Sequence, residues 1–85
     1  MTNHIIVGIH ITDRVRHVPE VQKTLTEFGC NIKTRLGLHE IGNAHCSPNG
    51  LLLIEFAGEL SRSEEFMAAL KKIEGVDCQK MVFSH

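Results

Sequence analysis

The chain has 85 residues and a formal net charge of −1, and 42% of its residues are hydrophobic and 22% charged. A chain of this length buries roughly 60% of the surface that its unfolded form exposes. Residues 1–85 are therefore expected to form one domain around a single two-layer core. The near-neutral charge argues against direct binding to nucleic acid, because nucleic-acid-binding domains normally carry a strongly basic surface.

The sequence contains no segment typical of a membrane span or a leader peptide. Its longest aliphatic run covers residues 51–54, whereas a membrane-spanning helix needs about 20 apolar residues. The first residues lead directly into a strand-like segment, without the basic and apolar regions of a signal peptide. The three cysteines have irregular spacing, which does not indicate a disulfide framework. We therefore expect a cytoplasmic protein with no membrane partner.

The first half of the chain predicts a strand followed by a helix. In residues 4–12 every second residue is aliphatic, as in a half-buried strand. Apolar residues then recur at three- and four-residue spacing from Val18 to Phe28, which predicts a helix. Pro19 suits its first turn and Gly29 suits the position just after its end.

The second half repeats this pattern after a hairpin. Residues 31–40 and 51–57 alternate as strands do, and the loop between them is rich in turn-forming residues. A hairpin centred near His45 would place Arg35 opposite Glu55, where opposite charges pair across strands. Apolar residues at helical spacing between positions 66 and 73 predict a second helix, and residues 76–83 predict a fourth strand.

The element order is therefore β-α-β-β-α-β. A weak internal repeat at an offset of 46 residues aligns Ile5 with Leu51 and Gly29 with Gly75. Two βαβ halves related by a pseudo-twofold axis are typical of the ferredoxin-like sandwich. We expect an α+β fold of this kind, with a four-stranded antiparallel sheet in the order 4-1-3-2 and two helices on one face.

In this fold the alternation of apolar residues along the strands predicts which side chains the helices cover and which they leave exposed. The residues expected beneath the helices are Ile5, Val7, Ile9, Ile11, Ile32, Leu36, Leu52, Ile54 and Phe56. The opposite face is expected to carry Ile6, Gly8, His10, Arg35, His39, Leu51, Leu53, Glu55, Met81 and Phe83. Small monomers rarely expose so apolar a surface. We therefore expect a homo-oligomer, either a dimer or a tetramer, whose interface contains Ile6, Leu51, Leu53, Met81 and Phe83.

Three motifs resemble the ACT-domain pattern over most of the chain. They are Asp13-Arg14, Val18-Pro19-Glu20-Val21 and Glu27-Phe28-Gly29-Cys30-Asn31-Ile32. In that pattern a strand-ending aspartate precedes a helix that finishes in Gly-x-Asn-Ile. ACT-like modules are regulatory domains that sense small molecules and act as dimers or tetramers. The sequence departs from the pattern after the aspartate, where the usual Pro-Gly is replaced by Val15-Arg16-His17.

Two further segments are similar to a stand-alone branch of ACT-like proteins, described as regulators of the iron-only hydrogenase system. They are Thr34-Arg35-Leu36-Gly37-Leu38-His39-Glu40 and Cys46-Ser47-Pro48-Asn49-Gly50-Leu51. The ligand domain of the nickel-responsive repressor shares the topology and places its His and Cys ligands on the second strand and just before the third. The resemblance implies a regulatory module that senses a ligand. Any effect on transcription would pass through a partner, because the chain has no DNA-reading helix of its own.

The start of the first predicted helix is a candidate ligand site. Arg14, Arg16 and His17 follow Asp13 in the loop where the resemblance places ligands. Cationic side chains beside a helix N-terminus favour an anion such as a carboxylate. The alternative is a charge cluster that is only solvated.

The hairpin offers a second candidate site. His39, His45 and Cys46 lie at one end of it, and imidazole with thiolate suits nickel or zinc. The alternative is a polar loop with an incidental thiol. A metal-binding sensor or chaperone is thus the second functional hypothesis. No Cys-x-x-Cys, glycine-rich phosphate loop or Ser-His-Asp arrangement is found, so we do not expect an enzyme.

Overall fold

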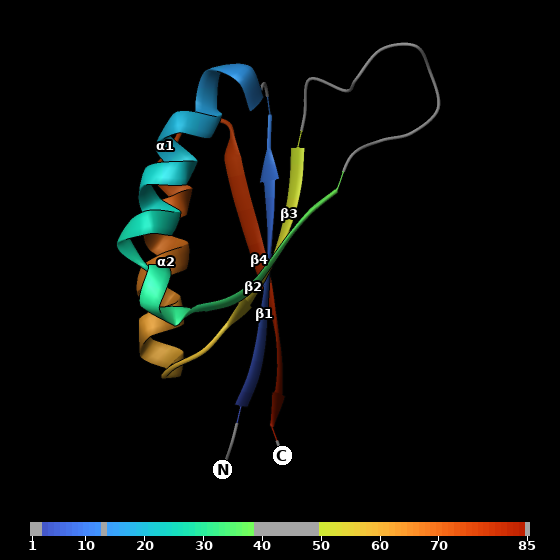
Figure 1. The fold of residues 1–85 in the computed structure, drawn as a ribbon, viewed down its shortest axis with the longest axis vertical. Helices are drawn as coiled ribbons and strands as arrows, with labels where there is room; N and C mark the ends of the chain where they lie inside the picture. Colours follow the sequence, from blue (N-terminus) through green and yellow to red (C-terminus); the bar gives the residue numbers. More distant parts are fainter. Residues whose placement is uncertain (1–2, 13, 39–49, 85) are drawn as a thin grey trace.

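The computed structural model describes residues 3–12, 14–38 and 50–84 (Figure 1). The elements follow the predicted βαββαβ order. In chain order they are β1 (Asn3–Ile11), α1 (Arg14–Glu27), a 3-10 turn (Gly29–Asn31), β2 (Ile32–Leu38), β3 (Gly50–Phe56), α2 (Leu60–Lys71) and β4 (Val76–Ser84).

The four strands form one antiparallel sheet in the order β2-β3-β1-β4, which is the predicted order counted from the other edge. Both helices lie on the same side of this sheet (Figure 1). The predicted ferredoxin-like sandwich is therefore confirmed. Neither helix of the described chain is both long and apolar enough to cross a lipid bilayer.

The core lies between the helices and β1. The inward residues of β1 are at most 2% exposed, as the alternation predicts; they are Ile5, Val7, Ile9 and Ile11. The Phe66 ring of α2 lies at the centre, with its centroid 5.2 Å from that of Phe28 and 5.3 Å from that of Phe56. Tilted rings at this spacing add to the free energy gained by burying apolar area. Phe66 of α2 thus packs with Phe28, directly after α1, and with Phe56 of β3 in one core.

A bulge in β2 overturns two of the predicted orientations. The pairing with β3 shifts between Ile32 and Thr34, so Thr34 lies opposite Glu55 and Arg35 lies opposite Ile54. Because an extra residue reverses the faces of the rest of a strand, Arg35 lies on the helix side. There its guanidinium donates to Gln22 Oε1 of α1 at 3.0 Å. The predicted Arg35–Glu55 pairing is therefore wrong.

The same bulge places Leu36 on the open side of the sheet, opposite Leu53. Leu36 is 51% exposed, so its predicted position beneath the helices is also wrong. The inward positions of Ile32 and Leu52 are confirmed, since both pack against the buried cluster. One extra backbone residue thus exchanges an arginine and a leucine between the two faces.

Helix α1 begins earlier than the sequence predicts. It starts at Arg14, so Pro19 lies inside the helix rather than near its first residue. Proline cannot donate to the carbonyl oxygen four residues before it, and its ring crowds that oxygen. The first turn of α1 lies across the top of the molecule, and the helix then runs down the sheet (Figure 1). A bend of this kind is typical of an interior proline.

Strand β4 keeps one register along its whole length and pairs with β1 from Val76 to Ser84. Cys78 is buried on the helix side, and Lys80 forms an ion pair with Glu64 of α2. Met81 and Phe83 alternate with these residues and lie on the open side, 55% and 57% exposed. Their predicted place on the open side is confirmed.

The turn between α2 and β4 closes against the start of α1. Gly75 has a φ of +81°, and its carbonyl oxygen accepts a hydrogen bond from the Thr12 N–H at 2.7 Å. A Cβ atom at Gly75 would lie 2.9 Å from two ring atoms of His17. Both the backbone conformation and the imidazole therefore require glycine at this position.

We expect Gly75→Ala to reduce the free energy of unfolding by about 1–3 kcal/mol, because a side chain is strained at this φ and crowds His17. Urea unfolding of the variant and the wild type measures this change. Gly29→Ala is the control, since a Cβ there meets nothing within 4 Å and its φ is not positive. An equal loss in both variants would contradict this account of Gly75.

Candidate functional site

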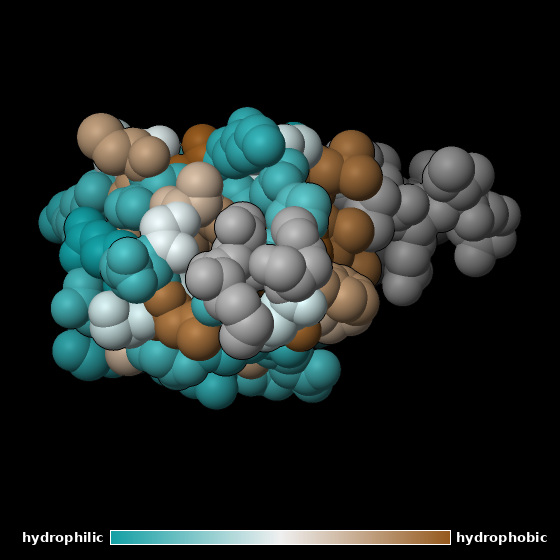
Figure 2. Space-filling model, turned by 90° about the horizontal axis from the view of Figure 1, so that it is seen from below, coloured by the Kyte–Doolittle hydropathy of each residue, from teal (hydrophilic) through white to brown (hydrophobic). Residues whose placement is uncertain are grey.

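The open face is the side of the sheet that the helices leave uncovered. Its side chains alternate with the buried ones along each strand. We define it as His4, Ile6, Gly8, His10, Thr34, Leu36, Leu51, Leu53, Glu55, Asp77, Gln79, Met81 and Phe83. Figure 2, seen from the end where both termini lie, shows hydrophobic side chains along the side of the molecule away from the helices.

The apolar residues of the open face are neighbours across strands. Leu36 lies opposite Leu53, and Ile6 lies opposite Met81. Leu51 is 39% exposed, while Ile6 and Leu53 are half-buried. The five residues predicted to form an oligomer interface thus all lie on this one face. Whether a second copy covers them stays a prediction.

A polar cluster lies on the open face near the end that holds the termini. The Glu55 carboxylate is 2.7 Å from His4 Nε2 and accepts a hydrogen bond from the Thr34 hydroxyl at 2.9 Å. Lys33 Nζ lies 3.9 Å from the same carboxylate. The hydrogen bond with His4, and next the bond from Thr34, lower the pKa of Glu55 below that of an isolated glutamate. This carboxylate therefore stays ionised at mildly acidic pH.

The predicted anion site is described only in part. Asp13 lies outside the described residues, and Arg14 is described only as the first residue of α1. The Arg16 side chain is exposed, whereas His17 is 8% exposed and packs against Gly75. Of the four predicted ligand-binding residues, His17 therefore has a clear packing role. The anion site itself stays a prediction.

The predicted metal site lies outside the described residues, since these do not include His39, His45 and Cys46. Within residues 3–12, 14–38 and 50–84, no group of three His, Cys, Asp or Glu side chains is placed to hold a metal ion. The described cysteines differ in environment: Cys30 is exposed, and Cys78 is buried with its Sγ 3.7 Å from the Met67 carbonyl oxygen. Burial raises the pKa of the Cys78 thiol, which suits a packing role.

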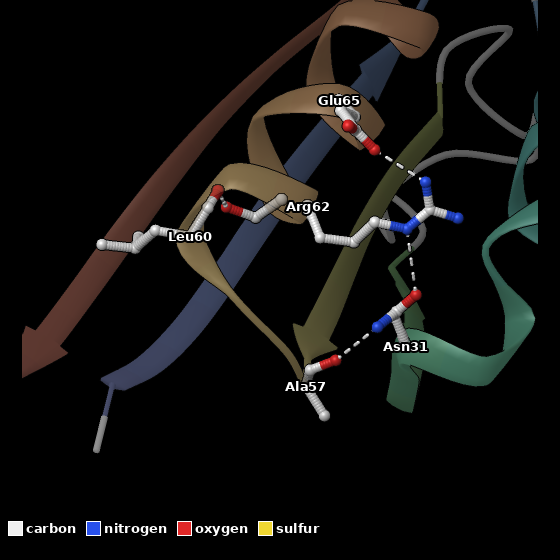
Figure 3. A network of polar contacts seen from close by, with 6 residues as sticks. Asn31, Ala57, Leu60, Arg62 and Glu65 are labelled. Carbon is white, nitrogen blue, oxygen red and sulfur yellow. Dashed lines mark hydrogen bonds and ion pairs between the residues drawn. The ribbon is translucent and has the colours of Figure 1, made fainter. Parts of the chain in front are cut away.

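Asn31, from the Gly-x-Asn-Ile motif, joins two connections at the end of the molecule that holds the termini (Figure 3). The side-chain amide of Asn31 donates to the Ala57 carbonyl oxygen at 2.8 Å. The main-chain carbonyl oxygen of Asn31 accepts a hydrogen bond from the Ala57 N–H at 2.6 Å. Arg62 Nε lies 3.4 Å from Asn31 Oδ1, and the Arg62 guanidinium is 4.2 Å from the centroid of the Phe28 ring. The sequence pattern pointed to this asparagine, and the structure gives it a structural role.

Comparison with known proteins supports the fold. No protein-family model matches the chain, and no curated protein matches it. The uncharacterized protein TM1266 from Thermotoga maritima has a similar structure, with a TM-score of 0.81, 17% identity, and coverage of 98% of this chain and 100% of that chain. CPII, a nitrogen regulatory PII-like protein from Thiomonas intermedia K12, was solved bound to ADP, AMP and bicarbonate. Its TM-score is 0.56 at 12% identity, over 99% of this chain and 96% of that chain.

These identities establish a shared fold and assign no family. In both cases the similarity extends over nearly the whole of each chain. The chain is therefore a small ferredoxin-like domain whose structural neighbours include a PII-like regulatory protein.

We expect the stability of the protein to fall as the pH drops through the lowered pKa of Glu55. A carboxyl group whose pKa is lower in the folded state stabilises that state above its unfolded pKa of about 4.3, and this stabilisation is lost on protonation. Urea unfolding at a series of acidic pH values measures the effect. Glu55→Gln should flatten this part of the profile.

Thr34→Val provides a graded comparison, because it removes one of the two hydrogen bonds that lower the pKa of Glu55. Its profile should lie between those of the wild type and Glu55→Gln. If all three proteins lose stability equally on acidification, the Glu55 cluster does not contribute to the pH dependence.

Proposed function

We propose that this protein is a non-enzymatic regulatory module that senses a small ligand, self-associates through its open face and acts in the cytoplasm on a partner protein. The observation that carries the proposal is the apolar open face itself. Leu36, Met81 and Phe83 are each more than half exposed on it, and exposed apolar patches commonly mark interaction sites. The PII-like neighbour, a regulatory protein solved with bound small molecules, supports the ligand-sensing part.

A second copy of the chain is the occupant that best fits this face. Ile6, Leu53 and Leu36 supply apolar surface between two polar ends, an arrangement similar to the apolar core and polar rim of protein interfaces. Each end also carries a carboxylate beside an imidazole. Glu55 contacts His4 at one end, and Asp77 lies opposite His10 at the other.

A twofold interface brings the same patch of each subunit together, so a patch must be complementary to itself. Apolar surface then meets apolar surface, and each polar end of one subunit faces an end of its partner that carries both a carboxylate and an imidazole. This charge pattern favours a homo-oligomer over a partner of a single charge sign.

We expect Leu53→Glu to convert the self-associated protein to a monomer, because it would bury an unpaired charge at the centre of the interface. Sedimentation at micromolar concentration measures the change. Leu60→Glu is the matched control, since Leu60 is 38% exposed at the start of α2, away from the open face. A wild-type protein that sediments only as a monomer would refute self-association.

The ligand is expected to be an anion bound near the start of α1. Arg16 is exposed in the first turn of this helix, where unpaired backbone N–H groups favour negative charge. The molecules bound to CPII are also anions: ADP, AMP and bicarbonate. These observations support an anion site at Arg16 within the predicted set Asp13, Arg14, Arg16 and His17, of which His17 packs against Gly75.

Titration with phosphate and with small carboxylates should shift the backbone amide resonances of residues 14–17. Arg16→Gln should weaken binding by about threefold to tenfold, as expected for the loss of one charge-assisted contact. Lys23→Gln, which removes an exposed lysine later in α1, controls for the general loss of positive charge. Shifts confined to the end of the sheet that holds the termini would contradict this site.

A further inference from the structure

The open face contains a hollow above Gly8, and three of its lining residues, His10, Leu51 and Asp77, also belong to the proposed self-association surface. Its volume is about 230 Å³, and it is lined by Gly8, His10, Leu51, Asp77 and Gln79 together with Cys78. Cys78 reaches it with its main chain only, because its side chain is buried on the helix side. The hollow lies on the opposite side of the sheet from α1, and it is therefore distinct from the predicted anion site.

The absence of a side chain at Gly8 produces the hollow. Gly8 lies in the central strand, with Leu53 opposite it on β3 and Gln79 opposite it on β4. The next row toward the β1–α1 connection contains Leu51, His10 and Asp77 in that order across the sheet. Three residues of one row and Gln79 of the next thus surround the main chain at Gly8.

The lining favours one class of ligand. Asp77 contributes a carboxylate whose Oδ1 already accepts the Cys78 N–H at 2.9 Å, and Gln79 contributes an amide oxygen of its main chain, 3.9 Å from the position of a Cβ at Gly8. The imidazole of His10 is planar, and Leu51 provides an apolar wall. A carboxylate and an amide oxygen accept hydrogen bonds from N–H donors, most strongly when the donor is cationic. The side chain missing at Gly8 and the planar His10 ring leave room for a planar ligand.

The volume limits the size of that ligand. Pockets for drug-sized molecules typically enclose about 300–1,000 Å³, so this hollow accommodates a single ring with its substituents. It is also open to solvent on an uncovered face. An isolated subunit is therefore expected to bind such a ligand weakly, in the millimolar range.

We propose that the hollow above Gly8 is a binding site for a planar, cationic, N–H-donating ring of amidine or amino-heterocycle type, held by Asp77 and Gln79. The proposal goes beyond the proposed function, which places an anion at the start of α1, by adding a second site for a cation on the open face. Because the hollow belongs to the open face, a second copy on that face would enclose the bound ring.

Benzamidine and benzoate test the charge requirement, because they have nearly the same shape and opposite charge. Each is titrated at neutral pH into the full-length ¹⁵N-labelled protein, and backbone amide shifts are recorded. Benzamidine should produce saturable shifts at Gly8, Leu51 and Gln79. Benzoate should leave these three amides unchanged. Equal shifts with both compounds would overturn the proposal.

Two variants test the site itself. A Cβ at Gly8 would lie 3.8 Å from Leu53 Cδ2 and 3.9 Å from the Gln79 carbonyl oxygen, so Gly8→Val fits the strand and fills the hollow. It should abolish the benzamidine shifts at Leu51 and Gln79. Asp77→Asn retains an oxygen for the Cys78 N–H, removes the charge, and should weaken benzamidine binding about tenfold. Wild-type affinity in both variants would overturn the proposal.

Gly37→Val is the matched control for the added side chain. Gly37 lies in β2 outside the hollow, and a Cβ there would meet Leu52 Cδ2 at an ordinary 3.5 Å. Its benzamidine affinity should equal that of the wild type.

Sedimentation of the same samples separates this inference from the proposed self-association. Benzamidine shifts in a protein that is monomeric throughout would support the hollow and refute the homo-oligomer. A wild-type protein that self-associates but shows no benzamidine shifts would support the homo-oligomer and refute the ligand site in the hollow.

Discussion

The fold depends on β1, because it is the strand that brings the two βαβ halves into one sheet. It pairs with β3 on one side and β4 on the other, over seven and nine residue pairs respectively. Its four inward aliphatic side chains are at most 2% exposed, and burial of each contributes about 1.5–3 kcal/mol. The Phe66 ring of α2 then packs against Phe28, just after α1, and against Phe56 of β3, the neighbour of β1, with ring centroids 5.2 and 5.3 Å away. The outward side chains of the same strand lie on the open face.

Because the two helices cover only one face of the sheet, the chain has two surfaces with different roles. The inward face holds the closely packed aliphatic and aromatic core. The open face combines exposed leucine, methionine and phenylalanine with a carboxylate–imidazole pair at each end. Gly8 in the central strand interrupts this second surface and leaves a hollow. The proposed self-association surface and the proposed ligand site therefore share one face, so occupancy of either would affect the other.

At each end of the sandwich, a residue that the sequence motifs associate with ligand binding makes a contact that holds the fold together. At one end Asn31 bridges the start of β2 and the β3–α2 connection through hydrogen bonds with Ala57. At the other end His17 packs against Gly75, whose positive φ lets the chain turn into β4. Each contact joins two segments that lie far apart in the sequence. A residue typical of a ligand-binding family thus serves here to hold the fold.

The sequence by itself determined the element order, the sheet topology and most of the inward face, because alternating and helical apolar spacings directly reflect which side of each element is buried. It also placed Ile6, Leu51, Leu53, Met81 and Phe83 on one open face. Only the tertiary structure decided the orientation of Arg35 and Leu36, since the bulge near Lys33 is a backbone feature that leaves no periodic signal. It likewise turned His17 inward, because α1 begins at Arg14 and its burial depends on contact with Gly75, 58 residues away in sequence. The hollow above Gly8 has the same origin, since its walls come from three strands that only the sheet brings together.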